Sequence, residues 1–343
     1  MSRALVSLPD NSILVSEGSG NIQVIHSDGT ITGPINGMPP LRSGDGRILM
    51  DIVADANFSQ NRRIFFAYEA AAPAGEEEPV GEEEPVGQVA SGILSSNMTR
   101  FENIQILGNY PGRRLASTTD GKLYITTTGY LEQRPEVMDL TTYSGKVLRI
   151  NADGSVPDDN PYNGQVNVRP EIYAIGHRDQ DGILIHPDTG ELWSIEHGPM
   201  GGDELNVVRP GLNYGWPYTT YGKNYDGTEI GPSQWNGTTQ PLYYWFPSLA
   251  PSGLVLVQQD AFPGWQGSLL VGSLSASQGR FLIRLVMEGE RVVAEEHLLI
   301  DYDRRIRDVT ETPDGNIYVL LDSENNTDAG RVFPGEVLKL TPR

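Results

Sequence analysis

The sequence contains no cysteine, which excludes a disulfide framework and any thiolate metal site. It has no apolar run long enough to cross a membrane, and it has no helical heptads. Basic residues are few, because 25 Lys and Arg stand against 45 Asp and Glu and give a formal net charge of -20. This balance disfavours duplex nucleic acid and anionic membranes as partners, and it suits cations.

Glycine and proline are abundant, with 39 and 24 residues, and they separate short runs of β-forming residues. A loose unit recurs in which a turn containing Asp or Gly precedes three or four β-formers. Its six copies cover residues 8–15, 61–68, 119–125, 186–193, 264–271 and 313–320. Six such units predict an all-β chain folded as a single six-bladed β-propeller over residues 1–343. A β-sandwich with chance Asp-Gly turns is the alternative. We expect the last strand, residues 336–340, to close the ring beside the N-terminal strands.

One segment is of low complexity. Residues 75–80 (GEEEPV) are repeated as residues 81–86, and the repeat extends to residue 87. Its two carboxylate triplets repel each other and cannot build a core, so residues 75–87 are expected to form a solvated acidic loop between two strands.

Three blocks carry the most specific signal: residues 176–182 (GHRDQDG), 196–204 (EHGPMGGDE) and 213–217 (NYGWP). In order and spacing they resemble the soluble aldose and glucose dehydrogenases that use pyrroloquinoline quinone (PQQ). The resemblance covers nearly the whole chain. It implies a calcium-bearing cofactor pocket and small-molecule sugar substrates.

The second block offers oxygen ligands of the kind that calcium prefers. Gly198 and Pro199 provide two carbonyls on a constrained turn, and Asp203 and Glu204 provide carboxylates. The resemblance implies that the Gly198 and Pro199 carbonyls hold the calcium linked to the cofactor. It assigns Glu204 and Tyr214 to a second calcium site, with Tyr214 using its backbone oxygen. A glycine-rich loop with surface acids is the alternative.

Three arginines are candidates for cofactor binding. Arg305 and Arg307 lie two apart, so on a strand they point to the same face. Guanidinium groups bind carboxylates in a bidentate manner, and the resemblance implies that Arg178, Arg305 and Arg307 contact the tricarboxylate PQQ. The alternative is a surface arginine pair matched to Asp301, Asp303 and Asp308.

Several positions depart from the pattern of the family. The His that serves as general base aligns with Tyr110, and a phenol with a pKa of roughly 10 is a poor base near neutrality. The histidines His177, His186 and His197 do not occupy that position.

Other positions that contact the cofactor have also changed. A Gln falls near Gly46 and a Lys near Ser275, while an Asn and a Gln correspond to Asp179 and Asp181. The pocket would thus lose a base and a cation and gain two carboxylates, and each change lowers the expected affinity for PQQ.

These departures lead to a hydrolase as the preferred hypothesis: a calcium-dependent enzyme acting on a lactone or similar small ester. In this hypothesis Asp179 or Asp181 is the base or a metal ligand, and Arg178 or Tyr110 stabilises the oxyanion. Turn capping before Gly182 is the alternative role for the two Asp residues. A PQQ-dependent aldose sugar dehydrogenase is the second hypothesis, and a non-catalytic binding propeller is the third.

The start of the chain bears on location. Members of the resembling family are usually exported to the periplasm or secreted, whereas residues 1–4 (MSRA) are not a signal peptide. We expect either a cytoplasmic protein or one whose leader is missing from this sequence.

Overall fold

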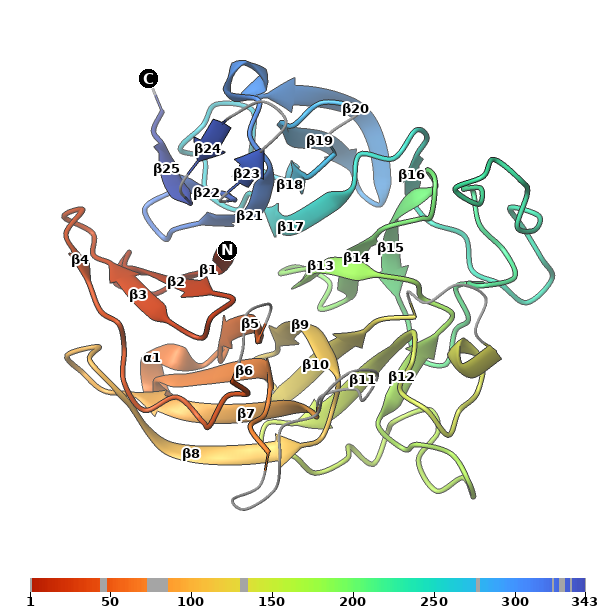
Figure 1. Ribbon diagram of the computed structural model, residues 1–343, viewed down its shortest axis with the longest axis horizontal. Coiled ribbons are helices and arrows are strands. Elements are labelled where there is room, and N and C mark those ends of the chain that lie inside the picture. Colours follow the sequence, from red (N-terminus) through yellow and green to blue (C-terminus); the bar gives the residue numbers. More distant parts are fainter. Residues whose placement is uncertain are drawn as a thin grey trace.

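The computed structural model describes residues 2–43, 48–72, 86–129, 135–275, 278–322, 324–326, 331–333 and 335–342. Six small antiparallel sheets stand around a central channel, which confirms the all-β six-bladed propeller (Figure 1). Helix within these residues is limited to α1 (Phe58–Asn61) and the short η1 (Pro135–Val137) and η2 (Ile300–Tyr302), and none of these could cross a membrane. Gly46 and residues 75–85 of the acidic repeat lie outside the described residues.

Five blades have four described strands each, and they follow one another along the chain. The first three are β1–β4 (Ser2–Ser7, Ile13–Glu17, Ile22–Ile25, Ile31–Thr32), β5–β8 (Leu49–Ala54, Arg63–Glu69, Gly87–Leu94, Phe101–Gly108) and β9–β12 (Gly112–Ser117, Lys122–Thr127, Lys146–Asn151, Ile172–Ile175). The next two are β13–β16 (Gln180–Ile185, Leu192–Glu196, Asp203–Val208, Tyr243–Trp245) and β17–β20 (Pro251–Leu256, Leu269–Ser273, Leu282–Glu288, Arg291–Leu298).

The sixth blade contains β21 (Ile306–Glu311), β22 (Ile317–Leu321) and β25 (Glu336–Leu340), and the hairpin of β23 (Glu324–Asn326) and β24 (Arg331–Phe333) is inserted before its last strand. The predicted final strand is therefore present, but β25 pairs with β22 and with no N-terminal strand in the described part of the chain. Blade six meets blade one through packing instead, because Tyr318 and Leu320 share a cluster with Leu5 and Ile13. Side-chain packing between neighbouring blades joins the two ends of the ring.

The predicted turn units lie between the first and second strands of the blades. Gly121 and Gly315 adopt φ values of 78° and 79°, which residues with a Cβ rarely adopt, so the Asp-Gly pairs make tight turns there. Apolar side chains pack between adjacent blades, as where Leu14 and Val24 of blade one share a cluster with Ile52 and Phe66 of blade two. The hydrophobic core is therefore a ring of inter-blade clusters around the channel.

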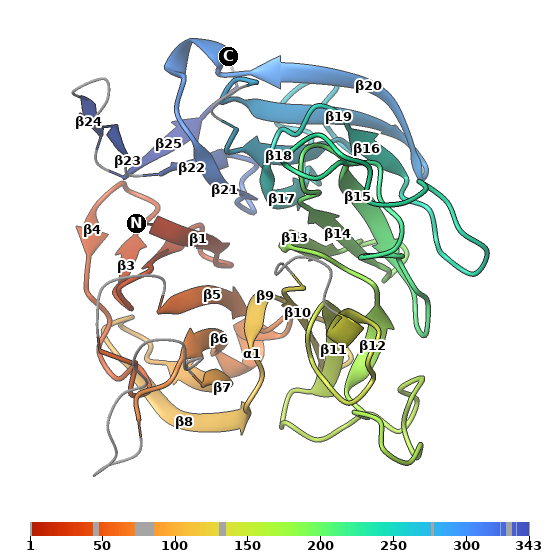
Figure 2. The same ribbon diagram turned by 45° about the vertical axis from the view of Figure 1, so that its right-hand side comes forward.

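The first strand of every blade, β1, β5, β9, β13, β17 and β21, borders the channel (Figures 1 and 2). Each of these strands departs from regular register near its beginning, as a β-bulge does. Three residues at these bulges have no regular partner on the neighbouring strand: Arg3, Asp181 and Arg307. In β9, the two residues Arg113 and Arg114 lie opposite a single residue of β10. Because a bulge changes where side chains point, polar and charged groups reach the channel from strands that otherwise alternate regularly.

Candidate functional site

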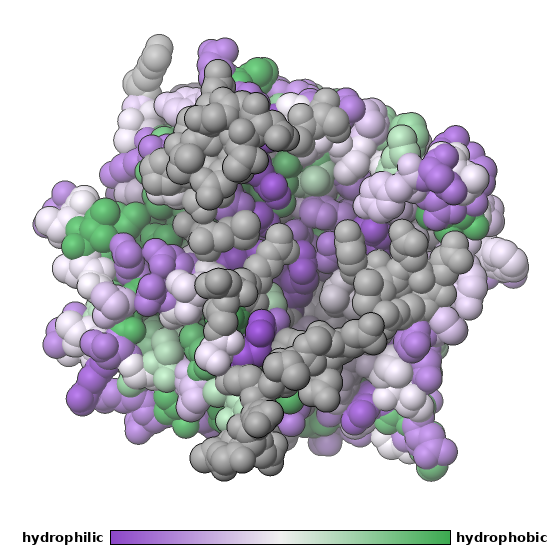
Figure 3. Space-filling model, in the orientation of Figure 1, coloured by the Kyte–Doolittle hydropathy of each residue, from purple (hydrophilic) through white to green (hydrophobic). Residues whose placement is uncertain are grey.

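A cavity of about 440 Å³ opens at one end of the channel. Its charged lining consists of four arginines and two aspartates, together with His197, and these are Arg113, Arg178, Asp179, Asp181, Arg305 and Arg307. Hydrophilic residues are seen deep in the middle of the face in Figure 3. Four guanidinium groups against two carboxylates make this cavity basic within a chain whose net charge is -20. The lining therefore favours an anionic ligand.

Arg113 binds both aspartates of this cavity. Its Nε lies 3.1 Å from Asp179 Oδ1 and 2.9 Å from Asp181 Oδ1, and its Nη2 lies 2.8 Å from Asp181 Oδ1. Although burial opposes ionisation, the positive charges of Arg113 and Arg114 hold the pKa of the Asp181 carboxyl well below its usual range. Asp181 therefore stays ionised and is a weak base, which argues against its predicted role in activating water.

His197 enters the cavity from the loop that follows β14. Its backbone N–H donates to Asp179 O at 2.9 Å, which places the ring between the two aspartates. Nε2 lies 2.6 Å from Pro251 O, and because a carbonyl only accepts, this nitrogen carries the proton. Nδ1 is then the nitrogen that can accept a proton, and it lies 3.6 Å from Asp179 Oδ2. His197 was not among the predicted site residues, because its position in the sequence does not match that of the His that serves the family as general base.

The three predicted cofactor-binding arginines all line this cavity. Arg178 packs over the Trp216 ring at 5.3 Å and donates from Nη1 to Gly198 O at 2.8 Å. Arg307 is buried and donates from Nη2 to Asp322 Oδ2 at 2.7 Å, while its Nε has no hydrogen-bond partner in the part of the chain that the structure describes. A buried N–H without a partner is a donor position that a bound carboxylate could satisfy.

The predicted metal residues divide between two cavities. Gly198 and Pro199 line the large cavity, whereas Glu204 and Tyr214 line a small one of about 20 Å³ that Gly198 also borders. Gly198 has no room for a side chain, because a Cβ there would collide with the carbonyl oxygens of Gly201 and Gly202. The turn is thus closely packed, with the Gly201 and Gly202 carbonyl oxygens beside the Gly198 backbone.

Glu204 lies beside a second buried carboxylate, Glu196. The Asn206 amide donates to both, at 3.0 Å to Glu196 Oε1 and 3.1 Å to Glu204 Oε2. Burial and the charge of Glu196 raise the pKa of Glu204 to about 8. No group of three or more His, Asp or Glu side chains suited to a metal occurs in the described part of the chain, so a cation here would depend on backbone and amide oxygens as well.

Asp203 has a structural role instead of the predicted one as a metal ligand. Its carboxylate accepts from Gly198 N at 3.0 Å, from Leu249 N at 2.8 Å and from Ala250 N at 2.9 Å, and the Ser248 hydroxyl donates to both of its oxygens. These bonds occupy the acceptor positions of Asp203 and tie the turn at Gly198 to the loop before β17.

Tyr110 does not line the cavity, which corrects its predicted catalytic role. Its side chain is buried in the cluster between blades two and three, with its ring 5.5 Å from that of Tyr143. Burial and the nearby Glu171 raise the pKa of Tyr110 above its usual value. A buried phenol that favours its neutral form neither accepts a proton nor stabilises an oxyanion in the cavity. Ser275 is also buried and is not among the residues that line the cavity, where Leu274 takes part.

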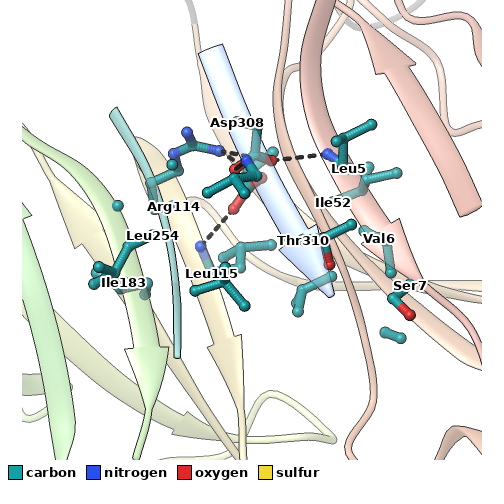
Figure 4. A pocket seen from close by; sticks show the side chains of 17 residues that line it. Leu5, Val6, Ser7, Ile52, Arg114, Leu115, Ile183, Leu254, Asp308 and Thr310 are labelled. Carbon is teal, nitrogen blue, oxygen red and sulfur yellow. Dashed lines mark hydrogen bonds and ion pairs between the residues drawn. The ribbon is translucent and has the colours of Figure 1, made fainter. Parts of the chain in front are cut away.

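A second cavity of about 270 Å³ lies in the channel, and Asp51, Arg114 and Asp308 contribute charged groups to its wall (Figure 4). Its polar groups hold neighbouring blades together, since Asp308 accepts from Leu5 N at 2.8 Å and Asp51 accepts from Leu115 N at 2.8 Å. Arg114 lies between them, 3.3 Å from Asp51 and 4.0 Å from Asp308. These carboxylates belong to the framework of the propeller. Asp308 is buried there, which removes the surface pairing considered for Arg305 and Arg307.

The sequence and the fold of this chain are similar to those of known sugar dehydrogenases. The family described as Glucose / Sorbosone dehydrogenase matches residues 1–331. Aldose sugar dehydrogenase YliI of Escherichia coli (strain K12) is 34% identical over 353 residues, covering 99% of this chain and 90% of its own. Quinoprotein glucose dehydrogenase B of Acinetobacter calcoaceticus is 32% identical over 265 residues, covering 59% of this chain and 54% of its own.

A solved structure of a glucose dehydrogenase is similar throughout, with a TM-score of 0.86, 36% sequence identity, and coverage of 99% of this chain and 96% of that one. The fold and these relatives thus define an enzyme built on a six-bladed propeller. The chain belongs to the glucose/sorbosone dehydrogenase family.

The preferred hypothesis of a calcium-dependent lactone hydrolase is therefore wrong. The relatives of this chain are sugar dehydrogenases, and two of the groups that the hypothesis named, Asp181 as base and Tyr110 as oxyanion group, are unsuited to those roles. The Asp181 carboxylate is ion-paired with Arg113, and Tyr110 is buried outside the cavity. The carboxylates of Asp179 and Asp181, which led to the hypothesis, are both paired with the guanidinium of Arg113, which the hypothesis did not include.

Proposed function

We propose that this chain is a PQQ-dependent aldose sugar dehydrogenase that oxidises the anomeric C–OH of a small sugar. The observation that carries the proposal is a basic cavity in an acidic protein. This cavity has a volume of about 440 Å³ and is lined by Arg113, Arg178, Arg305 and Arg307. Its size is within the range of small-molecule and cofactor sites. A tricarboxylate is a ligand that such a cluster of arginines recognises.

The residues present fit this cofactor. Arg178, Arg305 and Arg307 would bind its carboxylates, and the Nε of Arg307 has no partner among the described residues. The Gly198 carbonyl accepts from Arg178 and has a second lone pair that can face a cation. PQQ, when bound, supplies a quinone that accepts two electrons from the sugar. The Arg113 pairing offsets the charge of Asp179 and Asp181, which would otherwise repel a tri-anion.

His197 is the residue that we assign to proton acceptance in the reaction. Oxidation of an anomeric C–OH to a lactone removes two electrons and two protons, so the hydroxyl proton needs an acceptor in the cavity. Because Nε2 is held by Pro251 O, Nδ1 can take that proton, and Asp179 at 3.6 Å would stabilise the imidazolium that forms. This arrangement supports oxidation without an imidazole at position 110.

Calcium is the cation that we assign to the turn at Gly198 and Pro199 and to the small cavity at Glu204 and Tyr214. Two adjacent buried carboxylates, Glu196 and Glu204, repel each other, and a divalent cation would remove this repulsion. Calcium also accepts the backbone carbonyls that the turn provides.

The test is reconstitution. The purified chain would be titrated with PQQ in calcium-containing buffer by calorimetry, and dye reduction would be followed with a panel of aldoses. We expect saturable PQQ binding and dye reduction that requires PQQ. Arg305→Gln, which removes one cavity guanidinium, should weaken PQQ binding about tenfold or more, whereas the exposed Arg291→Gln should leave it unchanged. Absence of both PQQ binding and dye reduction by the wild type would overturn the proposal.

A further inference from the structure

A cleft outside the channel carries two exposed aromatic side chains. Trp235 is 62% exposed and Tyr218 is 55% exposed, whereas side chains of this size are usually buried for most of their area. Both line a cavity of about 390 Å³, a size typical of small-molecule sites. They come from the long connection between β15 and β16, and neither belongs to a hydrophobic cluster of the core.

The polar groups of this cleft are neutral. None of its lining residues is Asp, Glu, Lys, Arg or His, and Asn213, Asn236 and Thr238 contribute side chains to its wall. Within the described part of the chain, the Asn236 amide and the Tyr218 hydroxyl make no hydrogen bond. An ionised ligand would find no opposite charge here, and a purely apolar ligand would leave these donors and acceptors without partners.

The backbone that presents the two rings is fixed by hydrogen bonds. Thr238 binds Trp235 twice, since its N–H and its hydroxyl both donate to Trp235 O, at 3.1 and 2.9 Å. Thr239 N donates to Asn213 O at 2.8 Å, and Tyr218 N donates to Gly215 O at 2.8 Å. These hydrogen bonds fix the backbone around Tyr218 and around Trp235 before a ligand binds. Binding would therefore cost little conformational entropy.

The ligand that combines an apolar face with a rim of neutral hydroxyl groups is a sugar ring. Its C–H face can pack on the indole of Trp235 or the phenol of Tyr218, and its hydroxyls can pair with the free amide and hydroxyl groups beside them. We propose that this cleft binds one ring of a neutral oligosaccharide.

The cleft and the cofactor cavity are neighbours that share no lining residue. The segment between them carries Gly215, which lines the cleft, and Trp216, which packs against Arg178 and donates to Gly129 O at 3.0 Å. Binding in the cleft can therefore be measured without PQQ and without turnover. A failure of the dehydrogenase proposal would leave this measurement intact.

The experiment is an NMR titration of the indole N–H signals. The chain has five tryptophans, so Trp235→Phe identifies the Trp235 signal by its loss. The probes are maltohexaose, cellohexaose, xylohexaose and laminarihexaose, with a hexamer of galacturonic acid as the charged comparison. We expect at least one neutral hexasaccharide to shift the Trp235 signal saturably, and the charged hexamer to bind more weakly.

Variants locate the binding site. Trp235→Ala should weaken binding by calorimetry at least tenfold without lowering the melting temperature, because the side chain is mostly exposed. Tyr302→Ala removes an aromatic residue that is 53% exposed and lies in η2, so it should leave the affinity unchanged. The proposal is overturned if no neutral hexasaccharide binds at sugar concentrations up to about 10 mM. It is also overturned if Trp235→Ala binds as tightly as the wild type, or if the charged hexamer binds best.

Discussion

Arg113 is the residue whose removal tests the electrostatics of the cavity most directly. Arg113→Gln would leave Asp179 and Asp181, which are both buried, without the guanidinium that lies 3.1 and 2.8 Å from them. At an effective dielectric constant of about 20, one such contact is worth about 6 kcal/mol before desolvation is subtracted. Removal of one partner from a buried pair typically costs about 3–5 kcal/mol, so we expect a loss of this size in the free energy of unfolding.

Chemical denaturation of a double-mutant cycle measures this effect. Asp181→Asn in the Arg113→Gln background should recover part of the loss, with a coupling energy of about 2 kcal/mol. The matched control is Arg291→Gln, which breaks an exposed pair with Glu288 and should change stability by less than about 1 kcal/mol. A loss in Arg113→Gln no larger than that of the control, or strictly additive effects in the cycle, would refute the reasoning.

The same variant should change the acid limb of the stability profile. The pKa of Asp181 is lowered in the folded state, so its contribution is present above the unfolded value of about 3.9 and is lost as the pH falls below it. Without Arg113 the folded pKa rises, and acid unfolding should begin at a higher pH than in the wild type. An unchanged acid midpoint would show that Arg113 does not set the ionisation of Asp181.

Three further predictions follow from groups described above. Burial raises the pKa of Asp51 to about 6, so the stability it contributes is present below about pH 3.9 and is lost as the pH rises through 6. The stability of the wild type relative to Asp51→Asn should therefore fall by up to about 3 kcal/mol between pH 4 and 7, and a constant difference would contradict this. Chelation of calcium should lower the melting temperature of the wild type, and Glu204→Gln should reduce that shift; a wild-type melting curve indifferent to chelator and to added calcium argues against the cation. Tyr110→Phe should keep PQQ-dependent turnover within about twofold, while His197→Asn should lower it at least about a hundredfold, and the reverse order would restore a catalytic Tyr110.

Local patterns in the sequence predicted the fold well. The Asp-Gly turns depend on residues adjacent in the chain, and they predicted both the number of blades and the position of the strands that follow. The strand at residues 336–340 was located correctly, whereas its partner was not. Strand pairing depends on long-range packing, and here Tyr318 and Leu320 on β22 occupy the surface that faces blade one.

The candidate site was predicted in part. Arg178, Arg305 and Arg307 reach one cavity, as the neighbouring motifs predicted, although Arg305 precedes β21 and Arg307 lies at its bulge instead of on a regular strand. Arg113 was missed because it differs from its neighbour Arg114 only in the direction that the bulge gives it. Likewise, an aligned position does not give the orientation of a side chain, so Tyr110 was expected in the cavity although it packs into the core.

The bulges near the start of the six innermost strands have a consequence for how such a protein can change. At β1, β13 and β21 the unmatched position, Arg3, Asp181 or Arg307, has no partner of its own in the ladder, so the rest of the strand keeps its pairing whatever residue stands there. Substitution at these positions alters the charge of the channel while the sheet is spared. New charges can thus enter the channel without loss of strand pairing when the ion-pair partner changes as well, as for Asp181 with Arg113 or Arg307 with Asp322.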